Sequence, residues 1–411
     1  MSGADPSSSD PSSPGLSGPS PADLPPRGFP TQEFHARRDR AQALMAEAGL
    51  DALLLTTEPD IRWFTGFLTR FWESPTRPWF LIVPAAGDPV AVVPTLGAPL
   101  MRAAWLSDIR AWPSPAPQDD GVEPLRAALA ELTPPNARIG VPSGPETHLR
   151  LPLSAWARLG EALTPRRLTN DAGGMRDLRL IKSDREVEKI RAACAIAGRA
   201  FDRIGQEARA GDPLERLFRR FQALCLDEGA DWVAYLAGGA GQAGYADVIS
   251  PATETPLTEG DVLMLDTGVV HDGYFCDFDR NFSVGPPSPD TAAAHARLIE
   301  ATEAGFAAAR PGAAASDLFH AMDAVLTGGA GTAETGRLGH GLGSQITEWP
   351  SLLPHDRTIL APGMVLTLEP SLQTAPGRLM VHEENIVIGE TGAEWLSPRA
   401  APTLPILGEG P

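Results

Sequence analysis

"LMLDTGVVHDGYFCDFDRNF", residues 263–282, places Asp266 and Asp277 in a segment that otherwise has the composition of a buried β-hairpin. Its apolar run, valines and phenylalanines are residues that sheets favour. "HDG" at 271–273 is typical of a turn, because Asp and Gly tolerate a positive φ. A carboxylate inside such a strand costs free energy unless a cation, a donor network or solvent compensates it. The segment therefore predicts a hairpin whose two aspartates have a specific partner.

Three further candidate ligands lie downstream in short, distinctive contexts. "GHGLG" contains His340, "PGMVLTLEP" contains Glu369 and "MVHEENIVI" contains Glu383. The glutamates lie in or at the end of strand-like runs, and the glycines around His340 permit close backbone approach. Together with the two aspartates, these residues offer four carboxylates and one imidazole. That donor set suits a pair of divalent cations, and manganese, iron, cobalt and zinc are all compatible with it.

Composition narrows the class of protein. A chain of 411 residues with 43% hydrophobic content is long enough for two domains with a core in each. The 52 acidic and 34 basic residues leave a net charge of −18, which argues against nucleic acid or an anionic membrane surface as the partner. No stretch approaches the roughly 20 apolar residues of a membrane-spanning helix. Three widely spaced cysteines argue against a disulfide framework and favour a reducing cytoplasm.

The chain divides into a tail and two domains. Residues 1–30 are rich in Ser, Pro and Gly, lack signal-peptide features and are predicted to be disordered. Residues 31–170 begin with a helix that ends at Gly49 and then alternate strands with helices, which predicts an α/β domain. Residues 171–405 open with a helix whose Ser183 and Glu186 form a capping-box pattern. Helices and hairpins there lack βαβ alternation, so we expect an α+β domain with a largely antiparallel sheet.

In order and spacing, these blocks resemble the metal-binding motifs of the prolidase, Xaa-Pro aminopeptidase and creatinase superfamily. The two aspartates are 11 residues apart, and His340 precedes Glu369 by 29 residues. The resemblance implies a pita-bread catalytic domain, a creatinase-like N-terminal domain and a homodimer. It also implies two divalent metal ions per chain, with manganese, cobalt, iron or zinc as the metal. The implied ligands are Asp266, Asp277, His340, Glu369 and Glu383.

Glu384 competes with Glu383 as the last ligand. Counting back from "ETG" at 390–392 favours Glu383, and side chains alternate along a strand, so only one of the two should face the metals. By the same alternation, His382 should face away and have a structural role. In the family that the chain resembles, the glutamate matching Glu369 is catalytic: a hydroxide activated by the metals attacks the carbonyl, and this glutamate passes a proton to the leaving nitrogen.

The sequence departs from the family pattern around the substrate. Two histidines that hold the substrate are absent, since no histidine occurs between His148 and His271, and the seventh residue after His340 is Thr347. Tyr245 lies near the first slot, so Tyr245 and Thr347 are the predicted replacements. An arginine that the family carries two residues before the last ligand is also missing. Losing preorganised donors at a developing oxyanion typically costs ~10²–10³ in rate, so these departures indicate an altered substrate.

The leading hypothesis is a cytoplasmic metal-dependent hydrolase of the Xaa-Pro peptidase type, acting on a small peptide or peptide-like amide. One alternative is a hydrolase of the creatinase or cyclic-amidine type, which cleaves a non-peptide C–N bond; the absent histidines motivate it. Another is a non-catalytic binding protein on the same fold. That reading would normally be accompanied by lost metal ligands, and all five are present in this sequence.

Overall fold

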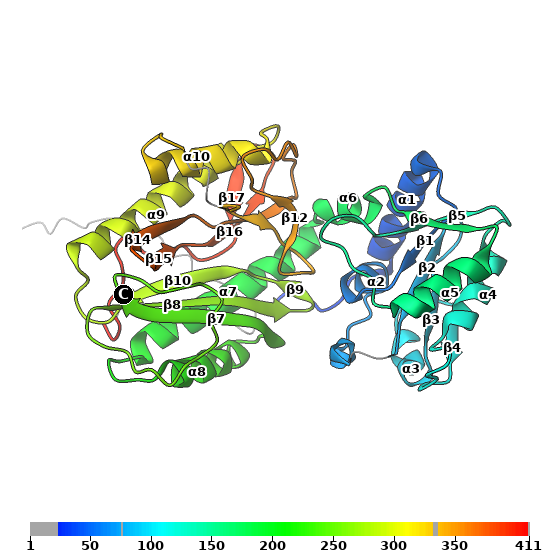
Figure 1. The fold of residues 1–411 in the computed structure, drawn as a ribbon, viewed down its shortest axis with the longest axis horizontal. Helices are drawn as coiled ribbons and strands as arrows, with labels where there is room; N and C mark the ends of the chain where they lie inside the picture. The colour runs from blue at the N-terminus through cyan, green and yellow to red at the C-terminus, as the bar shows by residue number, and fades with distance from the viewer. Residues whose placement is uncertain (1–23, 75–76, 332–335, 410–411) are drawn as a thin grey trace, which may run out of the picture.

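A computed structural model describes residues 24–74, 77–331 and 336–409, which form two domains side by side (Figure 1). The N-terminal domain contains a six-stranded sheet of order β4-β3-β2-β1-β5-β6. The β1–β2 and β2–β3 pairs are antiparallel and the other three pairs are parallel. The strands are β1 (Ala52–Leu55), β2 (Phe80–Pro84), β3 (Val90–Pro94), β4 (Ile109–Trp112), β5 (Arg138–Val141) and β6 (Arg167–Asn170).

Both faces of this sheet are covered, so alternate residues of β1 enter different apolar clusters. Leu53 and Leu55 pack in one cluster, and Ala52 and Leu54 pack in the other. The continuous apolar sequence of β1 follows from this double burial. The predicted helix stop at Gly49 is confirmed, because Gly49 adopts a left-handed φ of 63°. The helices are α1 (Thr31–Ala48), α2 (Glu58–Thr65), α3 (Ala98–Met101), α4 (Val122–Leu132), α5 (Leu153–Leu163) and α6 (Gly174–Leu180).

The C-terminal domain has an antiparallel sheet of order β10-β8-β7, with β9 paired to β8, and a second antiparallel sheet of order β12-β11-β13-β16-β17. β14 and β15 form a separate hairpin. The strands are β7 (Trp232–Gln242), β8 (Asp261–His271), β9 (Tyr274–Phe275), β10 (Phe278–Ser283), β11 (His340–Gly341), β12 (Glu348–Ser351), β13 (Val365–Leu368), β14 (Ser371–Ala375), β15 (Arg378–Val381), β16 (Glu384–Ile388) and β17 (Ala393–Trp395).

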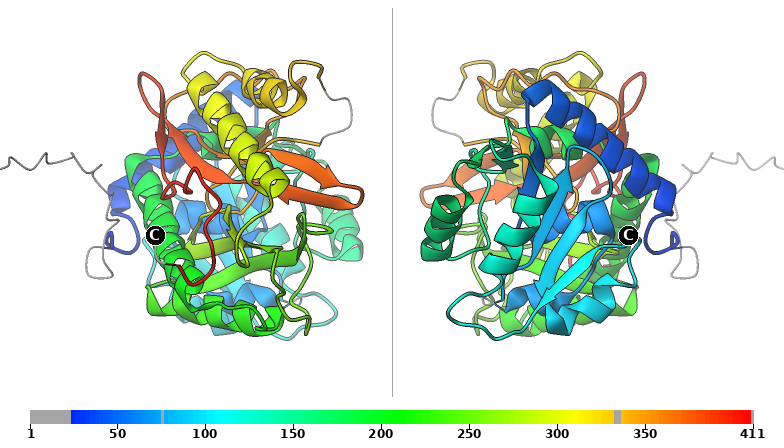
Figure 2. Two further views of the ribbon diagram at one scale, coloured as in Figure 1. Left: turned by 90° about the vertical axis from the view of Figure 1, so that its left-hand side faces the viewer. Right: turned by 90° about the vertical axis from the view of Figure 1, so that its right-hand side faces the viewer.

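Two helix pairs cover the outside of these sheets, as the end-on views show (Figure 2). α7 (Asp184–Glu207) and α8 (Leu214–Asp227) pack on β8 and β7, whereas α9 (Pro289–Ala308) and α10 (Ala315–Thr327) cover the second half. The predicted capping box at α7 is confirmed: the Ser183 hydroxyl accepts the Glu186 N–H, and the Glu186 carboxylate accepts the Ser183 N–H. The expected α+β fold with an antiparallel sheet is therefore observed, and the two sheets leave their inner faces for the candidate site.

The tail prediction is wrong for residues 24–30; residues 1–23 lie outside the described part of the chain. Arg27 donates to Asp231 at 3.0 Å, and the Gly28 N–H donates to Asp272 at 2.7 Å. The Phe29 ring packs edge-on against Tyr274, with 5.9 Å between ring centroids. This short segment is ordered because it buries an aromatic ring and satisfies two carboxylates, both more than 200 residues away in sequence.

Candidate metal centre

The hairpin predicted at residues 263–282 is present, and it separates the two aspartates. Asp266 lies within β8, and Asp277 immediately precedes β10. The turn between them has Asp272 at φ 47° and Gly273 at φ 82°, as the turn signal predicts. Both aspartates therefore lie on adjoining segments of one sheet.

The other three predicted ligands come from the second sheet. His340 opens β11, and Glu369 directly follows β13. Leu368 pairs with Glu384 across the β13–β16 ladder, so Glu369 and Glu383 occupy adjacent positions where these two strands meet. Strand pairing thus brings together residues that are far apart in the sequence.

Three of the five candidates form a tight, buried group. Asp277, His340 and Glu383 each offer one ligand atom, and these atoms all lie within 4.8 Å of one another. His340 Nδ1 donates to the Gly341 carbonyl at 2.8 Å, and Nε2 faces Asp277 Oδ2 at 3.4 Å. The contact at Nδ1 fixes the ring so that Nε2 is the nitrogen on the side of the carboxylates. A histidine held in this way by a backbone carbonyl is typical of a metal ligand.

Electrostatic interactions connect Asp266 and Glu369 to this group of three residues. Burial and the charge of Asp277 raise the pKa of Asp266 well above its usual value. The pKa values of Asp277 and Glu369 are also raised, mainly by burial, and that of Glu383 is raised well above normal by burial and by Asp277. Among the described residues, Asp266 Oδ1 and Glu383 Oε1 are buried without a hydrogen-bond partner. Four crowded carboxylates, two of which have an oxygen without a partner, fit a site for divalent cations. Bound cations would offset the repulsion between the carboxylates and would satisfy the two unpaired oxygens.

Glu384 has the opposite environment from Glu383. Arg280 Nη2 donates to Glu384 Oε2 at 3.0 Å, and the Ala400 N–H donates to Oε1 at 2.9 Å. His382 Nε2 lies 3.4 Å from Oε1. Although burial opposes ionisation, Arg280 and His382 lower the pKa of Glu384 to about 2. This satisfied carboxylate has no need of a metal, so the geometry favours Glu383 as the proposed ligand.

The two residues predicted to contact substrate, Tyr245 and Thr347, lie in different environments. Tyr245 is fully buried; its hydroxyl accepts the Val381 N–H at 2.6 Å and donates to Asn281 at 3.2 Å. An antiparallel bridge pairs Tyr245 with Leu379 of β15, so these contacts hold the residue in the fold. Its predicted substrate contact remains a prediction. Thr347 lines a cavity of about 100 Å³ at the junction of the two domains. Its substrate role remains a prediction.

Residues that we did not single out from the sequence also surround the proposed ligands. Burial and the adjacent Asp266 carboxylate raise the pKa of the Tyr235 phenol. From β16, Asn385 accepts the Asp277 N–H at 2.9 Å and donates to the Asp277 carbonyl. Asn385 follows the last ligand by two residues in "HEEN", which is the only sequence signal that points to it.

The fold and this donor set indicate a metallopeptidase. Similarity to known proteins agrees with that class. The chain belongs to metallopeptidase family M24, whose model matches residues 188–390. The creatinase/prolidase N-terminal domain matches residues 37–193. Among the residues that the structure describes, no helix is both long and apolar enough to cross a membrane.

Particular relatives carry peptidase names. The chain is 31% identical over 365 residues to a probable dipeptidase PepE of Mycobacterium tuberculosis, covering 87% of this chain and 92% of the relative. It is 30% identical over 227 residues to an Xaa-Pro dipeptidase of Pyrococcus furiosus, covering 54% of this chain and 64% of the relative. The crystal structure of dipeptidase PepE from Mycobacterium ulcerans superposes with a TM-score of 0.79 at 27% identity, over 92% of this chain and 99% of that one.

Proposed function

We propose that this protein is a divalent-metal-dependent peptidase that hydrolyses the C–N bond of short peptides, with Xaa-Pro dipeptides as the first substrate class. The observation that carries the proposal is the buried group of Asp277, His340 and Glu383, with ligand atoms within 4.8 Å of one another. Similarity to a probable dipeptidase and to an Xaa-Pro dipeptidase supports the substrate class.

The proposed ligands are Asp266, Asp277, His340, Glu369 and Glu383. When bound, a pair of divalent ions supplies polarisation of the scissile carbonyl and a nucleophile derived from water at neutral pH. His340 and the carboxylates of Asp277 and Glu383 are buried, whereas Asp266 and Glu369 are half-buried. Asp266 and Glu369 therefore border the side from which a substrate enters.

We assign proton transfer to Glu369. Its carboxyl group follows β13 at the half-buried edge of the cluster, and burial raises its pKa, an effect to which the charge of Asp277 adds. A carboxyl group with a raised pKa accepts a proton from water at neutral pH more readily than an ordinary one and can return it to the leaving nitrogen. Thr347, in the loop that follows His340, is the proposed substrate contact, and it lines the cavity at the junction of the two domains.

The second candidate function is hydrolysis of a non-peptide C–N bond such as that of an amidine. The specific observation that favours it is Thr347, which stands where the resembled peptidases carry a histidine and offers a hydroxyl in place of an imidazole. A manganese cofactor, a homodimer and a cytoplasmic location are further parts of the leading proposal. The three cysteines are buried and free, which supports a reducing compartment.

Turnover on a substrate panel tests the proposal. The metal-free protein is reloaded with Mn²⁺ or Co²⁺ and assayed on Xaa-Pro dipeptides, dipeptides without proline, and creatine-like amidines. We expect metal-dependent cleavage of dipeptides. Cleavage of amidines alone supports the second candidate, and metal binding without any turnover supports the non-catalytic binding protein.

A further inference from the structure

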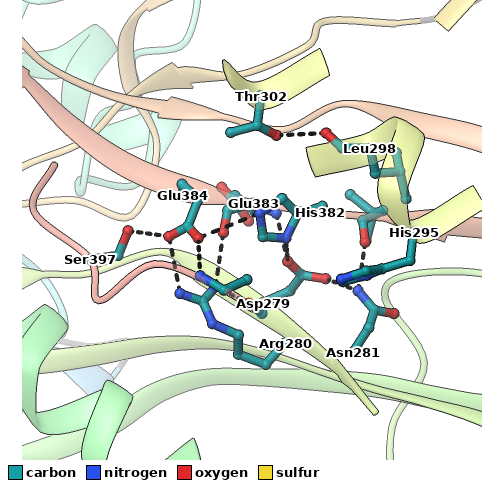
Figure 3. Close-up of polar contacts among 12 residues, drawn as sticks. Asp279, Arg280, Asn281, His295, Leu298, Thr302, His382, Glu383, Glu384 and Ser397 are labelled. Atoms are coloured by element: carbon teal, nitrogen blue, oxygen red, sulfur yellow. Dashed lines mark hydrogen bonds and ion pairs between the residues drawn. The ribbon is translucent and has the colours of Figure 1, made fainter. Parts of the chain in front are cut away.

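The backbone of Glu383 lies at a switch between two sheets, where strand pairing does not satisfy its polar groups (Figure 3). Val381 ends β15 and Glu384 begins β16, so His382 and Glu383 belong to neither strand. The Glu383 N–H donates to Asp279 Oδ1 at 2.6 Å, and the Glu383 carbonyl accepts from Arg280 Nη1 at 3.3 Å. Side chains of β10 therefore make the backbone hydrogen bonds that a neighbouring strand would otherwise make.

Asp279 is the central residue of this arrangement. It pairs with Asp266 across the β8–β10 ladder, so both carboxylates project from the same face of the sheet, and Asp279 is fully buried. Asn281 Nδ2 donates to Asp279 Oδ2 at 2.8 Å and to the Val381 carbonyl at 2.7 Å. Asp279 and Asn281 thus fix the backbone on both sides of His382.

His382 lies between two carboxylates. Its Nδ1 is 3.5 Å from Asp279 Oδ1, and its Nε2 is 3.4 Å from Glu384 Oε1. In the close-up, the His382 ring lies beside Asp279 while the Glu384 carboxylate turns toward Arg280 and Ser397 (Figure 3). The imidazole can donate to these carboxylates only in this ring orientation. His382 therefore links Asp279, which binds the Glu383 N–H, to the Glu384 carboxylate.

We propose that Asp279, supported by His382, is a positioning residue that aims the Glu383 carboxylate at the metal centre. This inference rests on the proposed function and adds to it residues that do not themselves take part in the proposed chemistry. The direction of the Glu383 side chain depends on the backbone dihedrals at 382–384, and the Asp279 contact with the Glu383 N–H restrains them. Removing such support for a ligand typically lowers metal affinity or activity by about 10- to 100-fold.

The test compares Asp279→Asn with Asp261→Asn. Asp261 is a matched control, because it is also buried in this sheet at 6% exposure and accepts a backbone N–H, that of Thr258, at 2.8 Å. It begins β8 and lies outside the ligand set. Both variants and the wild type are titrated with Mn²⁺ by calorimetry and with Co²⁺ by visible absorption, which reports ligand geometry independently of turnover.

We expect about 10- to 100-fold weaker Mn²⁺ binding and an altered Co²⁺ spectrum in Asp279→Asn, with wild-type behaviour in Asp261→Asn. Equal affinity in the two variants, whether both unchanged or both weakened alike, overturns the inference. If Asp279→Asn does not fold, His382→Gln decides: an altered Co²⁺ spectrum supports the inference and a wild-type spectrum overturns it. A wild type that binds no divalent ion overturns the proposed function itself, whereas a metal-binding wild type with an unaffected Asp279→Asn overturns only the positioning role.

Discussion

Glu383 and Glu384 are chemically identical neighbours in environments of opposite electrostatic character. Glu383 faces other carboxylates, and its pKa is raised well above normal by burial and by Asp277. Glu384 is paired with Arg280, and its pKa falls to about 2. Alternation along the chain predicts that only one of the two faces the site, but it does not say what the other contacts. The compensating group, Arg280, is 104 residues away.

Replacing each glutamate by Gln separates these roles. Glu383→Gln should weaken divalent-metal binding by about 100-fold or more, because a negatively charged ligand is lost. The metal-free fold should remain at least as stable, because one carboxylate fewer is buried among the others. Glu384→Gln should lower the free energy of unfolding by about 3 kcal/mol or more, because the Arg280 guanidinium, only 11% exposed, loses its carboxylate partner. Metal titration and denaturant unfolding of both variants check this. The assignment is contradicted if the two variants exchange these effects.

The carboxylates of the proposed ligands also give the stability of the metal-free protein a characteristic pH dependence. Folding raises the pKa of Asp266, Asp277, Glu369 and Glu383, so their contribution is fully present below the ordinary carboxyl pKa of about 4 and is lost as pH rises through the raised values. Bound divalent ions remove the repulsion. The gain in Tm on adding Mn²⁺ should therefore increase between about pH 5 and pH 8. A gain that is constant or falls over this range would contradict the assigned cluster.

At the scale of secondary-structure elements, residues close together in the chain predict local structure. They do not predict contacts between segments that are far apart in the sequence. The 263–282 hairpin and the α7 cap follow from turn and capping residues close together in the chain. The position of Tyr245 depends on a bridge to Leu379, which no local signal predicts. Composition predicts a disordered tail through residue 30, because the partners of residues 24–30 are distant in sequence: Asp231 lies just before β7, and Asp272 lies in the turn between β8 and β9.

The α7 cap provides a prediction about an element that is independent of the metal site. Ser183→Ala removes the hydroxyl that accepts the Glu186 N–H at the start of a 24-residue helix. The free energy of unfolding should fall by about 1 kcal/mol, the typical cost of losing a serine N-cap. Denaturant unfolding measures the loss. Metal affinity should be unchanged, and a large change in it would show that α7 is coupled to the ligands more directly than this account allows.

At the scale of the whole molecule, the N-terminal domain contacts the loop that follows His340. Arg179 donates to Asp60 at 2.8 Å and to Glu348 at 2.5 Å, and Lys182 donates to Glu348 at 3.0 Å. Arg62 of α2 donates to the Ser344 carbonyl at 2.7 Å. Arg179 and Lys182 lower the pKa of Glu348 to about 2 despite its burial. The two domains are therefore joined by buried charges next to the loop that follows the proposed ligand His340.

Glu348→Gln should consequently be strongly destabilising. It leaves Arg179 and Lys182 buried with one carboxylate fewer, and the expected loss is about 3 kcal/mol or more in the free energy of unfolding. Glu394→Gln is the control, because Glu394 is an exposed residue paired with Arg191 at 3.4 Å, and its loss should cost about 0.5 kcal/mol or less. Calorimetric unfolding of both variants measures the difference. Similar values for the two would show that the junction contributes little.

The most direct test of the central claim is a calorimetric titration of the metal-free wild type with Mn²⁺, beside Asp277→Ala. The account predicts about two ions bound per chain, with protons released as the raised carboxyl groups ionise, and loss of tight binding in the variant. Wild-type protein that binds no divalent ion, or Asp277→Ala that binds as tightly as wild type, would contradict the assignment of this carboxylate cluster as a metal centre.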